Sequence, residues 1–311
     1  MEMKLKRPPM NFTRFIKRFL SYLSNFAFLI PYITLFAIFF IYPFFYGLYI
    51  SLFKWNIFDP NVTEFVGFNN YYRILFEQGG LYFNYFWGGL GNTVLFVVIS
   101  VPVLILIALL IALLLDIQPP GYRLLRVIFF MPTVFSISAV ILIWRWQFNN
   151  SGFINSLLVS LGLEKVPFLS TQPWAWISIL IVTVWWTIGT NMVIIGAGLK
   201  DIDKSLYEAA EIDGANYFQQ LRYISVPSVA NQLFTITILT TIASFNIYGQ
   251  PELLTNGGPD FTTTVLMMRI RSLPFGSNPQ PGIASAMSVI LGLIMIAISL
   301  IQSKVAKKVG D

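Results

Sequence analysis

Residues 92–115 read NTVLFVVISVPVLILIALLIALLL and contain no charged side chain. A helix of about 20 mostly apolar residues crosses roughly 30 Å of hydrocarbon, because each residue advances the helix by about 1.5 Å. This stretch is long enough and apolar enough to do so. It therefore predicts a transmembrane helix, with the lipid bilayer as the main solvent of the segment.

Five further segments share this character, so the sequence predicts about six transmembrane helices. The predicted spans are residues 26–52, 92–115, 124–148, 174–199, 228–249 and 282–302. A mean hydropathy of +0.70 and a charged fraction of 11% lie outside the range of soluble domains. We expect an all-α polytopic membrane protein with one transmembrane domain (26–303), a basic N-terminal segment (1–25) and a short tail (304–311).

Basic residues concentrate at the two ends of the chain and in the fourth connection, between the fourth and fifth spans. The ends carry Lys4, Lys6, Arg7, Arg14, Lys17, Arg18, Lys304, Lys307 and Lys308, and the connection carries Lys200, Lys204 and Arg222. The positive-inside rule places all three in the cytoplasm. The first apolar run has no small-residue cleavage site, which indicates an uncleaved helix. The net charge of +6 suits membrane orientation better than nucleic-acid binding.

The missing residue types exclude several kinds of chemistry. The chain has no cysteine and no histidine, and therefore no thiolate nucleophile and neither of the commonest zinc ligands. It has no phosphate-binding loop with the Gly-Lys-Ser/Thr signature, so we expect no ATP site of the usual kind. We predict no catalytic residue and no metal site. The middles of the spans lack Asp, Glu and Lys, which disfavours an ion-coupled secondary transporter, although that alternative stays open.

The fourth connection, residues 200–227, is unusually polar and predicts a helix-turn-helix. Ser205 and Glu208 have capping-box spacing, so a short helix over 206–212 is expected, with Gly214 as its left-handed end. Asn216 can cap a second segment that ends before Pro227. This loop would lie on the cytoplasmic face.

The same loop resembles the "EAA" loop of ABC importer permeases. Glu208, Ala209, Ala210, Gly214 and Pro227 carry the match. The resemblance implies a coupling helix that docks on an ATPase subunit through the turn formed by Glu208, Ala209, Ala210, Asp213 and Gly214. Taken one at a time, these residues are equally explained as a cap, a helix end and the start of a span.

Other segments are similar to carbohydrate-uptake permeases of the maltose and glycerol-3-phosphate type. They are residues 65–71, Asn92 with Thr93, residues 129–132, residues 144–149 with Gly152 and Asn155, and residues 254–259 with Thr264. Asn246 departs from the Phe-Asp that is frequent in relatives, which leaves the substrate preference open. A permease for glycerol-phosphate-like or other polar solutes is the alternative.

The resemblance also implies a set of partners in a bacterial inner membrane. These are a second, homologous permease in a heterodimer, two ATPase subunits that bind ATP and Mg²⁺, an extracellular solute-binding protein, and a sugar. No cofactor is expected on this chain. Alternating access driven by ATP would then carry the substrate inward.

Two polar stripes mark where a sugar could pass. Thr183, Thr187 and Asn191 recur every four residues in the fourth span, and the fifth span presents Thr237, Thr241, Ser244 and Tyr248 at similar spacing. Sugar recognition needs hydroxyl or amide partners and flat aromatic surfaces, so the further candidates are Trp185, Trp186, Asn246 and Gln250. Helix packing explains any single member equally well. The second span, which is almost uninterrupted Val, Leu and Ile, is expected to face lipid.

Overall fold

The computed structural model describes residues 28–56, 63–275 and 278–310, with the backbone alone for 307–310. The basic segment predicted at 1–25 lies outside this described part. The protein is mostly helical, and its strands within the described residues are β1 (Phe53–Lys54) and β2 (Glu64–Phe65), which pair antiparallel. Four described helices are long and apolar enough to cross a membrane: Phe28–Ile50, Leu81–Asp116, Trp174–Lys200 and Pro281–Ala306.

Two bent helix pairs raise the number of candidate spans to six. Tyr122–Val134 and Ile137–Gln147 meet at 103°, and Tyr217–Ser228 and Ala230–Phe245 meet at 61°. The structure therefore has four to six candidate spans, and it reaches the predicted six if each bent pair is one span.

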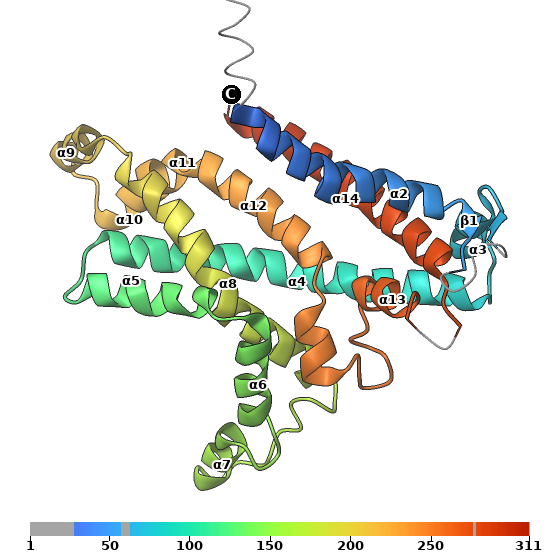
Figure 1. Ribbon diagram of the computed structural model, residues 1–311. Coiled ribbons are helices and arrows are strands. Elements are labelled where there is room, and N and C mark those ends of the chain that lie inside the picture. Colours follow the sequence, from blue (N-terminus) through green and yellow to red (C-terminus); the bar gives the residue numbers. More distant parts are fainter. Residues whose placement is uncertain (1–27, 57–62, 276–277, 311) are drawn as a thin grey trace, which may run out of the picture.

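The elements follow one another around a long central helix, α4 (Leu81–Asp116) (Figure 1). The first span contains the π-helix η1 (Ala37–Ile41) and α2 (Tyr42–Ile50), and it lies beside the last helix, α14 (Pro281–Gly310). Between α2 and α4 comes α3 (Asn69–Leu75). The middle of the chain forms α5 (Tyr122–Phe130), the 3₁₀ turn η3 (Met131–Val134), α6 (Ile137–Gln147), α7 (Phe153–Ser160) and α8 (Trp174–Lys200).

The remaining elements build the two ends of the bundle. At the end farthest from α3 lie α9 (Lys204–Ile212), α10 (Tyr217–Gln220), the π-helix η4 (Leu221–Ser225) and α11 (Val226–Ser228) (Figure 1). The chain then returns along α12 (Ala230–Phe245) to η5 (Pro251–Thr255) and α13 (Leu266–Ser272).

The prediction that the second span faces lipid is wrong for one of its faces, although side chains such as Val98, Leu106 and Leu110 on the rest of the helix are exposed. Helix α4 packs against α8, α12 and α13, and it buries Thr93, Phe96, Ser100, Ala108 and Ala112. Hydropathy could not show this, because a lipid chain and a neighbouring helix are equally apolar surroundings. The small side chains Ser100, Ala108 and Ala112 let the neighbouring backbones approach, so α4 is the centre of the core.

The third span, expected to be continuous over 124–148, breaks between α5 and α6. Pro132 lies in the 3₁₀ turn, Phe135 is extended, and the Ser136 hydroxyl accepts a hydrogen bond from the Ala139 N–H at the start of α6. Gly189 of α8 crosses this break so closely that a Cβ there would lie 2.6 Å from the Phe129 carbonyl oxygen. The break therefore depends on both local sequence and a close helix crossing.

Several of the segments that resemble the permease family stabilise irregular parts of the fold. Asn70 is buried and donates to the backbone carbonyls of Ser51 at 2.8 Å and Phe53 at 3.0 Å. Asn155, also buried, donates to the carbonyl of Val166 and accepts from its N–H, which fixes the return from α7. These asparagines replace missing backbone partners in irregular segments.

The segments around Asn92 and Thr264, far apart in sequence, pack against each other. Asn92 donates to the carbonyls of Phe261 (3.1 Å) and Thr264 (2.9 Å), and the Thr93 hydroxyl accepts from the Leu266 N–H at 3.0 Å. These contacts hold the start of α13 against α4.

Candidate functional site: a polar cavity and an exposed helical loop

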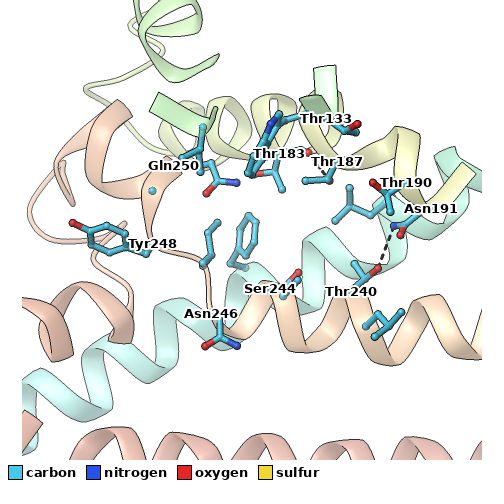
Figure 2. A pocket seen from close by; sticks show the side chains of 18 of the residues that line it. Thr133, Thr183, Thr187, Thr190, Asn191, Thr240, Ser244, Asn246, Tyr248 and Gln250 are labelled. Carbon is cyan, nitrogen blue, oxygen red and sulfur yellow. Dashed lines mark hydrogen bonds between the residues drawn. The ribbon is translucent and has the colours of Figure 1, made fainter. Parts of the chain in front are cut away.

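A cavity of about 890 Å³ lies between α8, α12, η5 and the break that precedes α6. Its volume is within the range of roughly 300–1,000 Å³ typical of sites for small organic ligands. Figure 2 shows threonine, serine, asparagine and glutamine side chains projecting into it from several elements. Phe96 and Leu104 of the central helix α4 form part of its apolar wall.

Helix α8 supplies one polar wall. Thr183 and Thr187 each donate a hydrogen bond of 2.7 Å to the carbonyl four residues earlier. Their donors are therefore used within the helix, while their oxygens can still accept from a ligand. Asn191 donates to the Thr240 hydroxyl of α12 at 3.2 Å and so connects the two walls (Figure 2).

Helix α12 and the segment after it supply the opposite wall. The Ser244 hydroxyl accepts from Ser100 at 3.2 Å, and Asn246 donates to the Ile242 carbonyl at 2.8 Å. Both residues line the cavity, as does Tyr248. Of the predicted candidates, Thr187, Asn191, Ser244, Asn246 and Tyr248 therefore come together around one space.

Gln250 is the polar group best placed to meet a ligand. Its side chain is 5% exposed, lines the cavity and points into it in Figure 2. Within the described residues its amide has no hydrogen-bond partner. Among the described residues, the fully enclosed side-chain atoms without a partner belong to Gln147, Gln232 and Gln302, whereas the Gln250 amide opens to the cavity. Its donor and acceptor are thus available to a bound molecule.

Two residues predicted for the substrate path, Trp185 and Thr241, do not line this cavity. Trp185 packs edge-on against Trp144, with ring centroids 5.7 Å apart. Thr241 is buried between α12 and α14, where its hydroxyl donates to Thr237 and accepts from Gln302 at 2.9 Å. The neighbouring Trp186 does line the cavity, and its indole N–H donates to the Phe135 carbonyl. A four-residue spacing identifies one helix face but not which neighbour that face meets.

Sequence reasoning missed other lining residues for identifiable reasons. Thr133 of η3 and Ser138 of the first turn of α6 lie on the two sides of a break in a segment that was expected to be a straight span. Glu252 of η5 and Arg271 of α13 follow α12 in the chain, and the sequence has no signal that these elements line the cavity. Thr190 and Thr240 extend the two polar stripes and could have been found by following each stripe around its helix.

The exposed loop is capped differently from the prediction. Helix α9 begins at Lys204, and the Asp203 side chain, not that of Ser205, is the N-cap, accepting from the Ser205 N–H at 2.9 Å. This hydrogen bond lowers the pKa of the Asp203 carboxyl. Asn216 caps α10 in a complete capping box with Gln219. The helical chain then continues past Pro227 to Ser228 rather than ending before it.

The turn after α9 contains Gly214 with φ of +78°, the left-handed conformation that was predicted. The Gly214 N–H bonds the Glu211 carbonyl and the Ala215 N–H bonds the Ala210 carbonyl, which is the Schellman pattern. Glu208, Ala209 and Asp213 are exposed and Ala210 is half-buried. Ile212 is 87% exposed, which is unusual for an isoleucine in a polar loop. The loop therefore presents a short, firmly ended helix away from the bundle (Figure 1).

A direct contact connects α9 to the following helical segment. The Tyr207 hydroxyl lies 2.9 Å from the Ser225 hydroxyl of η4. Because α9 follows α8 and η4 leads into α12, the loop is attached to both helices that wall the cavity. Among the described residues no group of three or more Asp or Glu side chains could hold a metal ion.

Comparison with known proteins places this arrangement in context. Residues 74–311 match the family described as binding-protein-dependent transport system inner membrane component. The probable ABC transporter permease protein YurN of Bacillus subtilis is 30% identical over 91% of this chain and 95% of its own. The lactose transport system permease protein LacF of Rhizobium radiobacter is 29% identical, with 94% and 97% covered.

A third relative and a solved structure agree with this. The trehalose/maltose transport system permease protein MalF of Thermococcus litoralis is 31% identical, with 90% of this chain and 92% of its own covered. A chain of a bacterial ABC transporter involved in the import of the acidic polysaccharide alginate superposes with a TM-score of 0.74 at 21% identity, covering 96% of this chain and all of that one. That likeness shows a shared fold.

Proposed function

Because this chain belongs to the family of binding-protein-dependent transport system inner membrane components, we propose that it forms half of the path by which an ATP-driven importer moves a sugar across the membrane. Its relatives are permease subunits, which are membrane components rather than enzymes. The observation that carries the proposal is the cavity, which is lined by hydroxyl and amide side chains, including the Gln250 amide that points into it.

The chemistry of the cavity suits a carbohydrate. A sugar presents many hydroxyl groups, each of which can donate and accept, and it has apolar ring faces that pack on aromatic side chains. Trp186, Tyr248 and Phe96 provide aromatic surface beside the polar walls. Relatives named for lactose and for trehalose or maltose support the same substrate class.

The loop containing α9 is the proposed docking site for an ATPase subunit, which would bind ATP and Mg²⁺. Its exposed Ile212 and the exposed residues of the Glu208–Gly214 turn offer a compact contact surface. The connections of this loop to α8 and α12 support a lever mechanism. A displacement of α9 when the ATPases close would move both walls of the cavity.

The rest of the assembly follows from the same proposal. A homologous permease would form the other half of the path, both termini and α9 would be cytoplasmic, and an extracellular binding protein would deliver the substrate. A solved relative, 22% identical with a TM-score of 0.73, is described as an alginate transporter in complex with an alginate pentasaccharide-bound periplasmic protein. That description supports delivery by a binding protein in this class of importer.

The test is ATP-dependent uptake of labelled sugars by complexes reconstituted with their partner subunits. Replacing Asn191 with Leu removes the amide that bridges α8 and α12, so uptake should fall while assembly is retained. Thr235→Leu is the matched control, because Thr235 is an exposed residue of the same helix as Thr240 and bonds only its own helix. Uptake that persists without the ATPase subunits would reject the proposal.

A further inference from the structure

The lining of the cavity contains two charged residues of opposite sign. Glu252 of η5 and Arg271 of α13 both line the cavity, and every other lining residue is uncharged at neutral pH. The formal charge of the lining is therefore zero.

The two charges do not neutralise each other directly. Within the described residues the sole ion pair closer than 4 Å joins Arg73 and Glu77. The guanidinium of Arg271 instead lies over the Tyr248 ring, 4.5 Å from its centroid. Stacking occupies the face of the guanidinium and leaves its N–H edge free to donate. The carboxylate of Glu252 likewise keeps its capacity to accept.

We infer that Glu252 and Arg271 are specificity residues that select uncharged oligosaccharides over acidic ones, an inference that rests on the proposed sugar path. A sugar hydroxyl can donate to Glu252 while another accepts from Arg271, so a neutral sugar satisfies both charged groups together with the Gln250 amide. An acidic sugar would bind Arg271 but would be repelled by Glu252, and an amino sugar would have the opposite conflict. This preference differs from that of the alginate transporter whose fold the chain shares.

Arg269 provides a matched control for Arg271. It lies two residues earlier on α13 and also stacks on aromatic rings, at 4.1 Å from the Tyr85 centroid and 5.1 Å from that of Phe261, but it does not line the cavity. Replacing either arginine removes one positive charge from the same helix. Only the change at 271 alters the charge of the cavity.

The experiment measures equilibrium binding of labelled maltotriose, raffinose and trigalacturonate to the full complex in lipid nanodiscs, without binding protein. The wild type should bind a neutral trisaccharide about tenfold or more tightly than trigalacturonate. Glu252→Gln should raise trigalacturonate affinity by about tenfold and lower that of the neutral sugar. Arg271→Gln should weaken both, with the larger loss for trigalacturonate. Arg269→Gln should leave the ratio unchanged.

Arg271→Lys is the control for misassembly. It keeps the positive charge, so the complex should still bind the neutral sugar more tightly than trigalacturonate. Wild-type preference for trigalacturonate would overturn this inference, as would an unchanged ratio in correctly assembled Glu252→Gln and Arg271→Gln complexes. In both cases sugar binding would still support the proposed function. A correctly assembled wild type that binds none of the three sugars, even in a wider panel of neutral and acidic oligosaccharides, would reject both.

Discussion

At the scale of single residues, Gly214 controls the end of the exposed helix α9. Its φ of +78° costs other L-residues about 1–2 kcal/mol, except that Asn tolerates this region better. Open space surrounds the position, so backbone conformation rather than crowding decides what fits. Gly214→Val should therefore abolish substrate-stimulated ATP hydrolysis in reconstituted complexes, whereas Gly214→Asn should retain most of it. If the Val variant kept as much substrate-stimulated ATP hydrolysis as the Asn variant, the conformation of the turn would not matter for coupling.

Asp203 is the second residue whose role can be isolated. Its pKa is lowered by the Ser205 N–H, so the cap is formed above the unfolded-state pKa and is lost as pH falls through the lower, folded-state value. Asp203→Ala should speed amide hydrogen exchange in α9 at neutral pH, because the cap is removed. Ser205→Ala should have a smaller effect, because it keeps the backbone N–H that contributes most to lowering the Asp203 pKa and removes only the weaker contribution of the Ser205 hydroxyl. Faster exchange in the Ser205 variant alone would restore the capping box first predicted.

At the scale of elements, the crossing of α8 over the break before α6 shapes one side of the cavity. A Cβ at Gly189 would lie 2.6 Å from the Phe129 carbonyl oxygen and 2.7 Å from the Phe130 Cα, both backbone atoms that cannot rotate away. Gly189→Ala should therefore separate the two elements and cost about 1–3 kcal/mol.

The measurement for this crossing is the thermal unfolding midpoint of the purified complex, together with sugar uptake. Gly196→Ala is the control on the same helix, because no atom lies within 4 Å of the added Cβ. It should leave the midpoint unchanged or raise it slightly, since Ala favours helix over Gly. A midpoint lowered equally by both substitutions would point to a general effect on α8.

At the scale of the whole molecule, the orientation in the membrane is the prediction with the widest consequences. Both termini and Glu208 should face the cytoplasm and the connection between α12 and α14 should face outward, because basic residues concentrate in the first set. The chain has no native cysteine, which makes single-cysteine labelling direct. Asp260 suits the outer label because it is exposed, whereas Gly257 is left-handed and tightly packed against Thr264.

Glu208→Cys should react with a membrane-impermeant maleimide only after the membrane is opened, and Asp260→Cys should react in intact cells. The reverse pattern would invert the topology and would place α9 out of reach of any cytoplasmic ATPase. Reaction of both residues in intact cells would show that the chain does not cross the membrane between Glu208 and Asp260, which would contradict the assignment of α12 as a span.

The segments that resemble the permease family can be recognised from the sequence, but their structural role is visible only in the tertiary contacts. Asn92 and Thr93 were matched to the family without a physical reason, and the structure supplies one, because they hold the backbone around Phe261, Thr264 and Leu266. Gly152 has a similar role, since a Cβ there would meet the Trp146 carbonyl oxygen. Such residues are recognisable from sequence, but their partners lie too far along the chain to be inferred from spacing.

The sequence by itself determined the helical membrane character, the polar loop with its left-handed Gly214, and the family, because hydropathy, helix-ending chemistry and local spacing are properties of neighbouring residues. The tertiary structure alone decided that one face of α4 is buried in the core, that Trp186 and not Trp185 reaches the cavity, and that Glu252 and Arg271 line it. The physical reason is that lipid and protein interiors are equally apolar. Composition therefore shows that a helix lies in the membrane, while only packing shows which of its faces meets a neighbour, a lipid or a substrate.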